Sequence, residues 1–196
     1  MYPSIICRMS ASEKKLYLTF DDGPLPTVTP HVLSILKQYN AKATFFCVGD
    51  NVSKHPQEYA QLLNEGHAVG NHTQHHLNGF KTSLNQYKED VQQAATHISS
   101  NLFRPPYGRF MPAQYNALRA DYNIVMWDVL SYDFDTRVTK HQCLHNVIKH
   151  SRNGSVIVFH DSVKASDKML YALPQVLDHF SKLGYAFGKL PQLIKP

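Results

Sequence analysis

The chain has 196 residues, of which 43% are hydrophobic and 18% charged, and its formal net charge is +5 at pH 7. These values are typical of one folded globular domain and exclude a disordered chain. The Lys and Arg residues are scattered in runs no longer than a pair, so we expect no nucleic-acid binding. No stretch approaches the ~20 apolar residues of a membrane helix, so we expect no membrane span.

The three cysteines, Cys7, Cys47 and Cys143, lie far apart and form no CxxC pair, so we expect reduced thiols. Near the N-terminus only Ile5-Ile6-Cys7 is apolar, which is too short for a signal peptide. We therefore expect a cytoplasmic monomer for the chain as given, with export open if a signal has been removed.

Strand patterns alternate with helical patterns along almost the whole chain. Alternating residues 16–20 predict the first strand, and Thr29-Pro30 predicts an N-cap followed by the first helical residue. Further strands are expected at 43–48, 68–71, 102–104, 123–127, 155–159 and 185–187. Helices are expected at 30–39, 56–65 (Leu62 and Leu63 inward), 84–98 (capped by Ser83; Leu84, Tyr87, Val91, Ala95 and Ile98 on one face), 112–120, after Thr139, and through 176–180.

The apolar strands read as buried on both faces, which predicts a parallel sheet with helices outside. An open doubly wound sheet and a barrel fit this alternation equally well. In both folds the active site lies where strands end at their carboxyl termini. The unusual polar residues are placed there: Asp21, Asp22, His72, Arg104, Asp128, Asp133, His160 and Asp161.

His72 and His76 are four residues apart, and one helical turn would let both rings face a single ion. With Asp22 they would form a two-His, one-carboxylate set that leaves positions open for water and substrate. His75 could replace His76 if the segment is not helical. His141 and His145 share the spacing, but they lie in a capped amphipathic helix and are interpreted as solvated.

Arg104, followed by Pro105-Pro106, could hold a carboxylate in a bidentate pair. The alternative is a Pro-Pro turn with an incidental surface arginine. His160, at the end of an apolar strand, could be kept charged by Asp133 and act as a general acid. The alternative is a structural core histidine.

Taken together, these segments resemble the ordered motifs of the polysaccharide deacetylases, the NodB-homology domain of carbohydrate esterase family 4. The resemblance covers about residues 15–193. It is carried by five motifs: Thr19-Phe20-Asp21-Asp22-Gly23, His72-Thr73-Gln74-His75-His76, Arg104-Pro105-Pro106-Tyr107-Gly108, Asp133-Phe134 and Val158-Phe159-His160-Asp161.

The resemblance implies a deformed (β/α) barrel of seven parallel strands with helices outside. It also implies one divalent metal, with zinc expected and Co²⁺ or Ni²⁺ as alternatives, bound by Asp22, His72 and His76. Asp21 would be the base that activates water, and Arg104 would orient it. The remaining implied roles are oxyanion binding by the Tyr107 N–H, protonation of the leaving amine by His160, and tuning of that histidine by Asp133.

Two positions depart from the family pattern, because Phe134 replaces a usual Trp and Val158 replaces a usual Leu beside the acetyl methyl group. Both keep an apolar wall of altered shape. The resemblance thus predicts a single catalytic domain over 15–196, after an extension over 1–14, that deacetylates N-acetylglucosamine residues of a chitooligosaccharide or peptidoglycan.

Several alternatives stay open at this point. One is an O-acetyl ester hydrolase acting on xylan, and another is a metal-free relative acting on small linear amides, which the three ligands disfavour. A catalytically silent glycan-binding module would be expected to lack Asp21 or His160. A structural zinc domain would want four closed ligands, usually with cysteine.

Overall fold

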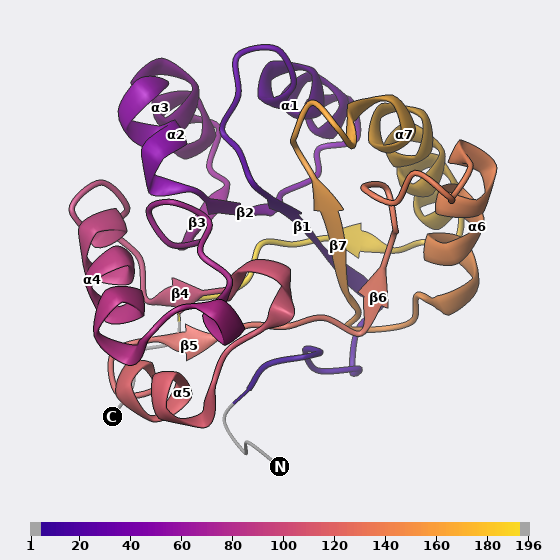
Figure 1. Cartoon of the computed structure of the whole chain (residues 1–196). Helices are drawn as coiled ribbons and strands as arrows, with labels where there is room; N and C mark the ends of the chain where they lie inside the picture. The colour runs from indigo at the N-terminus through magenta and orange to yellow at the C-terminus, as the bar shows by residue number, and fades with distance from the viewer. Residues whose placement is uncertain (1–4, 193–196) are drawn as a thin grey trace.

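Parallel strands form the centre of the molecule. The structure is a computed structural model that describes residues 5–192 (Figure 1). Its strands are β1 (Lys15–Asp21), β2 (Thr44–Cys47), β3 (Ala68–Asn71), β4 (Leu102–Phe103), β5 (Asn123–Ile124), β6 (Val129–Leu130), β7 (Val156–His160) and β8 (Ala186–Phe187). Seven of them follow the order β5-β4-β3-β2-β1-β7-β6, and β8 pairs with the start of β1. The sheet curls into half a barrel, so the predicted deformed (β/α) barrel is confirmed.

Helices surround this half-barrel on its outer side (Figure 1). They are α1 (Thr29–Gln38), α2 (Gly49–Lys54), α3 (Pro56–Asn64), α4 (Leu84–Ala95), α5 (Pro112–Leu118), α6 (Lys140–His150) and α7 (Ser166–Lys182), with short 3-10 turns η1 (Gly79–Lys81) and η2 (Pro106–Gly108). Ser83 and Thr139 accept backbone N–H groups of the first turns of α4 and α6, as their capping patterns predict. No helix within residues 5–192 is long and apolar enough to cross a bilayer.

The core is organised by aromatic side chains from three neighbouring strands. Phe20 of β1 stacks between Phe45 of β2 and Phe159 of β7, with ring centroids 5.0 and 5.9 Å apart. All three are buried. Because each buried aromatic side chain contributes on the order of 1.5–3 kcal/mol, this stack fixes the strands beneath the site.

The register of the strands brings their ends to one level. Asp21 lies opposite Phe46 on β2 and opposite His160 on β7. On the other side, β3 ends directly before His72 and β4 ends directly before Arg104. Polar residues that are far apart in the sequence therefore meet at one mouth of the half-barrel.

Several details of the predicted elements were wrong. Thr29 is not an N-cap, because it is the first residue of α1 and its hydroxyl donates to Asp161 at 2.7 Å. Leu63 is 47% exposed, so only Leu62 of that pair points inward. On α4 the buried position is Ala94 and not Ala95. The pattern also missed α2 and the two-residue strand β6, which are too short to show a period.

A segment near the N-terminus crosses the lower end of the half-barrel. Ile6 donates its N–H to the Ile124 carbonyl at 2.9 Å and accepts the Met126 N–H at 2.7 Å. Two residues later, Arg8 forms a bridge with Ser155, at the start of β7. The segment therefore connects the part of the sheet around β5 with the part around β7. The three cysteines are free thiols, with Cys47 and Cys143 buried.

Candidate active site

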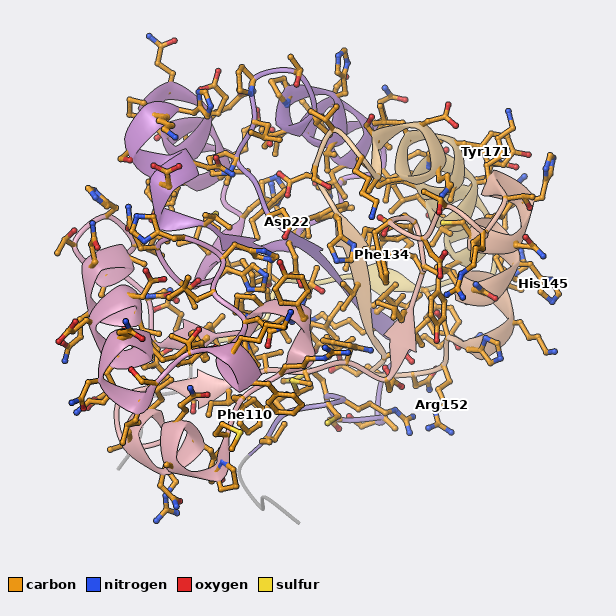
Figure 2. All side chains as sticks on the ribbon, in the orientation of Figure 1. Asp22, Phe110, Phe134, His145, Arg152 and Tyr171 are labelled. Atoms are coloured by element: carbon orange, nitrogen blue, oxygen red, sulfur yellow. The ribbon has the colours of Figure 1, made fainter. Side chains whose placement is uncertain are left out.

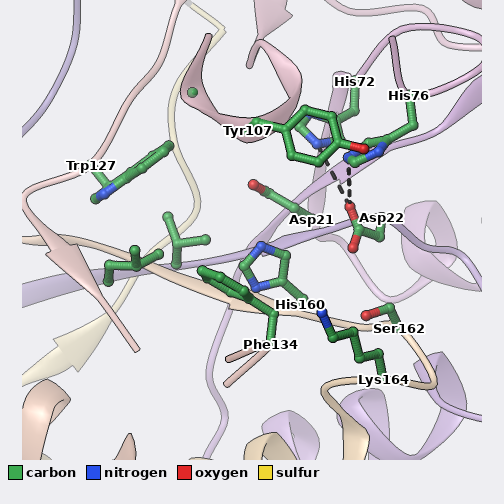
Figure 3. Close-up of a pocket in the computed structure, with 13 residues that line it drawn as sticks. Asp21, Asp22, His72, His76, Tyr107, Trp127, Phe134, His160, Ser162 and Lys164 are labelled. Carbon is green, nitrogen blue, oxygen red and sulfur yellow. Dashed lines mark ion pairs between the residues drawn. The ribbon is translucent and has the colours of Figure 1, made fainter. Parts of the chain in front are cut away.

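A cavity of about 430 Å³ opens at the carboxyl ends of the strands. Its floor is polar, and one wall is apolar (Figure 3). The lining residues are Asp21, Asp22, His72, His76, Tyr107, Gly108, Trp127, Leu130, Phe134, Val158, His160, Ser162 and Lys164. In Figure 2, Asp22 and Phe134 lie over the middle of the sheet, whereas His145 lies on the outer edge of α6. His141 and His145 are exposed there, so they lie outside the cavity.

Asp22, His72 and His76 bring three ligand atoms within 4.8 Å of one another. The Asp22 Oδ1 atom lies 3.2 Å from His76 Nε2 and 3.8 Å from His72 Nε2, as the dashed lines in Figure 3 indicate. This buried oxygen has no hydrogen bond of good geometry within the described residues. A buried acceptor without a hydrogen bond usually has a ligand or ion as its partner. Because this oxygen faces two imidazole nitrogens, the three atoms together suit a bound cation.

The protonation of His72 suits a metal ligand. Its Nδ1 lies 2.7 Å from the Arg104 carbonyl oxygen, which can only accept, so Nδ1 carries the proton and Nε2 keeps its lone pair. Burial lowers the pKa of His72 to about 4. For Asp22, burial opposes ionisation, but contact with His76 and the nearby His160 and His72 hold the pKa below its ordinary value. Both side chains are therefore in the form that binds cations.

The segment that carries the two histidines is a loop, so the predicted helical turn was wrong. Thr73 and His76 have φ values of 64° and 56°, which belong to the left-handed region. Asp90 of α4 accepts the N–H groups of Gln74 and His75 at 2.9 and 3.0 Å. The ring of His75 also bonds Asp90, at 2.6 Å. His75 is thus held away from Asp22, although the loop is not helical.

Asp21 is held by Arg104, a fully buried arginine. The Arg104 Nη1 donates to Asp21 Oδ1 and to Thr19 Oγ1, both at 2.7 Å. Its other nitrogens donate to the carbonyl oxygens of Val125 and Met126. The contact with Asp21 runs through one nitrogen, so the expected bidentate geometry was wrong: the guanidinium is shared between β1 and the two residues that follow β5. The incidental surface arginine is excluded by the burial.

His160 is paired with Asp133 in the same cavity. Asp133 accepts the His160 Nδ1–H at Oδ1 and the His160 backbone N–H at Oδ2, both at 2.7 Å. Burial alone would lower the pKa of His160, but the charge and hydrogen bond of Asp133 outweigh it and raise the pKa to about 9. The imidazole is therefore charged at neutral pH, with Nε2 left to act as a donor.

The apolar wall faces these polar groups. Trp127, Leu130, Phe134 and Val158 line it, and the Phe134 ring lies 5.0 Å from the His160 ring in an edge-on arrangement. At the rim, Tyr107 is 59% exposed and its ring centroid is 4.6 Å from that of His76. Its φ of 60° turns the backbone of η2 sharply at this point.

Comparison with known proteins decides the family. The sequence model described as polysaccharide deacetylase matches residues 8–125. A peptidoglycan-N-acetylglucosamine deacetylase of Bacillus cereus is 34% identical, over 94% of this chain and 90% of its own length. The chain belongs to the polysaccharide deacetylase family.

Two further relatives agree with this assignment. A chitooligosaccharide deacetylase of Azorhizobium caulinodans is 29% identical, over 94% of this chain and 96% of its own length. A crystal structure of a peptidoglycan N-acetylglucosamine deacetylase, bound to 4-naphthalen-1-yl-N-oxidanyl-benzamide, superposes with a TM-score of 0.90 at 31% identity, covering 96% of this chain and 91% of that one. The protein is a glycan-deacetylating hydrolase, and the resemblance drawn from its five motifs is confirmed.

The deacetylase site also contains supports that the sequence did not reveal. Asp161, which is buried, accepts the Gly23 N–H at 3.0 Å and the Thr29 hydroxyl at 2.7 Å. A Cβ atom on Gly23 would lie 2.0 Å from Asp161 Oδ2, so only glycine fits there. Burial raises the pKa of Asp161 to about 7. The pair fixes the turn that follows Asp22.

Asp128 lies outside the deacetylase site, although the sequence placed it with the other strand-end residues. It accepts the Val156 N–H at 2.9 Å and the Ser155 hydroxyl at 3.0 Å, at the start of β7. This is the opposite end of the strand from His160. The sequence did not show this, because β6 has only two residues. It begins directly after Asp128, so Asp128 lies before the strand and not at its carboxyl end.

Proposed function

We propose that this deacetylase removes the N-acetyl group from N-acetylglucosamine residues of a chitooligosaccharide or peptidoglycan, using one divalent metal ion. The observation that carries the proposal is the three-ligand group of Asp22, His72 and His76 beside a carboxylate and an imidazole with separate partners. The names of the Bacillus and Azorhizobium relatives support the choice of sugar. Residues 15–196 are proposed as the catalytic domain.

Asp22, His72 and His76 would hold the metal ion. We favour zinc, because two imidazoles and one carboxylate are ligands that it accepts at an open catalytic site, and Co²⁺ or Ni²⁺ could bind the same set. When bound, such an ion lowers the pKa of a water molecule towards about 7 and polarises the acetyl carbonyl.

Asp21 accepts the proton of the attacking water in this proposal. Arg104, 2.7 Å from its Oδ1, fixes the orientation of the carboxylate and leaves Oδ2 for the water. The Tyr107 N–H donates to the oxyanion that develops on the acetyl oxygen. Phe134 and Val158, in the apolar wall, exclude water from the acetyl methyl group.

His160 supplies the second proton transfer. An amine leaves poorly unless its nitrogen is protonated as the C–N bond breaks, so the reaction needs an acid. Asp133 holds the imidazole charged through Nδ1, which directs the Nε2–H at the leaving nitrogen. After the step, acetate and a free sugar amine remain.

The metal and base assignments can be tested together. The purified protein should contain about one metal ion per chain, measured by elemental analysis, and His72→Ala and His76→Ala should lose it. Asp21→Asn should keep the metal but lose roughly 10²–10⁴-fold in kcat, because only the base is removed. A preparation that stays active and metal-free after chelation would contradict the proposal.

The substrate can be tested by measuring acetate release from chitooligosaccharides, peptidoglycan and acetylxylan. We expect release from the first two. Release from acetylxylan alone would mean that the site acts on O-acetyl esters instead.

A further inference from the structure

The turn between β7 and α7 carries a lysine into the active-site cavity. Ser162 and Lys164 both line it, and Figure 3 draws the Lys164 side chain extended beside His160 and Phe134. The Ala165 N–H donates to the Ser162 carbonyl at 3.1 Å, which closes the turn. Asp161 and Ala165, on either side, are both buried. The turn is therefore anchored on both sides of the exposed lysine.

The other charged groups of the cavity already have partners. Asp21 has Arg104, His160 has Asp133, and Asp22 faces the two histidines. Lys164 has neither an ion pair nor a hydrogen bond within residues 5–192. Many other lysines of the chain do bind an oxygen: Lys14, Lys42, Lys54, Lys168, Lys182 and Lys189. An unpaired ammonium at the wall of a substrate cavity is free to bind an anion that arrives with the substrate.

We propose that Lys164 binds a carboxylate that the glycan carries next to the acetamide group, and that the enzyme therefore prefers an anionic glycan to neutral chitooligosaccharide. The inference rests on the proposed function, in which His160 contacts the leaving nitrogen. Because that nitrogen is attached to C2 of the sugar, the nearest substituents are those on C3 and C1. Lys164 follows His160 by four residues and lines the same cavity, so it faces these substituents.

Two sources could supply such a carboxylate. One is an ether-linked lactyl group at O3 of the sugar that adjoins the acetylated N-acetylglucosamine, and the other is a peptide stem attached to that lactyl group. In a glycan with peptide stems the lactyl carboxylate is blocked as an amide, and the carboxylates lie further out on the peptide. Chains with and without stems therefore distinguish a contact at the sugar from one at the peptide.

The effect should appear in substrate binding and not in the chemical step. Removing one partner of a solvent-accessible charge pair costs a few-fold in affinity, so we expect KM to rise by about 2- to 5-fold with kcat unchanged. The change should shrink as salt is raised towards about 1 M, because salt screens exposed pairs. A lysine that acted only through its field on His160 would instead alter kcat for every substrate.

The experiment compares the wild type with Lys164→Gln and with Lys149→Gln, which removes the same charge from an exposed position on α6. Acetate release is measured on chitotetraose, on glycan chains of equal length with free lactyl carboxylates, and on chains with peptide stems. Binding of each glycan is also measured by calorimetry, so that recognition is scored separately from turnover.

We expect Lys164→Gln alone to raise KM and weaken binding for carboxylate-bearing chains, with chitotetraose unaffected. Loss on the lactyl chains alone would place the carboxylate on the sugar, and loss on the stem-bearing chains alone would place it on the peptide. An equal change for chitotetraose, or no change for any glycan, would overturn the inference. Binding that depends on Lys164 without any acetate release would refute the proposed function and leave the inference standing.

Discussion

Two hydrogen bonds join His160 to Asp133. The carboxylate accepts from both the ring and the backbone of the histidine, so it fixes the ring orientation as well as its charge. Because the pKa of His160 is raised to about 9, the imidazolium persists through neutral pH and is lost as the pH rises through about 9. Its contribution to folding stability is correspondingly complete below about pH 6.5 and lost above pH 9.

Asp133→Asn should move the alkaline limit of activity. Without the carboxylate, burial dominates and the pKa of His160 falls, so the imidazolium is lost at lower pH. We expect the alkaline limb of a kcat–pH profile on an N-acetylated oligosaccharide to shift down by more than one pH unit. Asp135→Asn, which removes a carboxylate paired with Arg137, should leave the limb in place. An unmoved limb in Asp133→Asn would show that His160 is not the acid.

At the residue scale the sequence predicted which side chains meet, because polar residues directly after apolar strands are placed together by any parallel sheet. It chose His76 over His75 from a helical turn that does not form. In the structure that choice depends on Asp90, which lies 14 residues beyond His76 and binds the His75 ring. A contact of this kind leaves no periodic pattern.

At the scale of elements, the loop after β3 is shaped by α4. Asp90 accepts two backbone N–H groups of the loop, and Asn71 accepts the Thr73 N–H at 2.8 Å. These bonds replace those that a helical turn would have made. Thr73 and His76, whose backbone φ values are positive, then turn the His76 ring towards Asp22. The loop is thus ordered by side chains that are not themselves ligands.

Asp90→Ala should weaken metal binding without removing a ligand. Supporting residues of a metal site typically contribute 10–100-fold in affinity, and we expect a loss of that size, measured by competition with a chelator. His75→Ala removes one of the Asp90 contacts but keeps the backbone bonds, so it should bind metal almost normally. If His75→Ala lost the metal as completely as His76→Ala, His75 would be a ligand and the assignment of the loop would be wrong.

The elements that the sequence predicted well are those with long patterns and local caps. Ser83 and Thr139 act within their own first turns, so the pattern contains the whole interaction. Thr29 has the same chemistry, but its hydroxyl is bound by Asp161, which is 132 residues away. Similarly, β6 has two residues and is defined only by its pairing with β7. Such features arise from tertiary contacts, which no local pattern contains.

For the whole molecule, the alternation of strands and helices predicted a parallel sheet but could not distinguish an open sheet from a barrel. Both folds need the same alternation, and the difference lies in how far the sheet curls. Here the curl places Arg104, which follows β4, in contact with Asp21, and it places His160 of β7 in the same cavity as Asp21. The segment around Ile6 crosses the lower end of this curled sheet.

Ile6→Pro should affect activity as well as stability. Proline removes the N–H that bonds Ile124, next to the Val125 and Met126 carbonyls that hold Arg104. Each 1 kcal/mol lost in a protein of this size lowers Tm by about 2–4 °C, and we expect a drop of that order in calorimetry. We also expect kcat to fall with metal content unchanged. Ala11→Pro, at an exposed residue of the same segment, should change neither; a normal kcat in Ile6→Pro would show that Arg104 does not need this support.

The sharing of Arg104 among separate parts of the chain has a consequence for the order in which the enzyme becomes competent during synthesis. The proposed metal ligands all lie within the first 76 residues. The carbonyls that complete the hold on Arg104 belong to residues 125 and 126, and the proposed acid, His160, is paired with Asp133. A growing chain would therefore acquire its metal-binding residues first and its base orientation and proton donor last. On the proposed mechanism, hydrolysis would need β7 in place, because this strand carries His160.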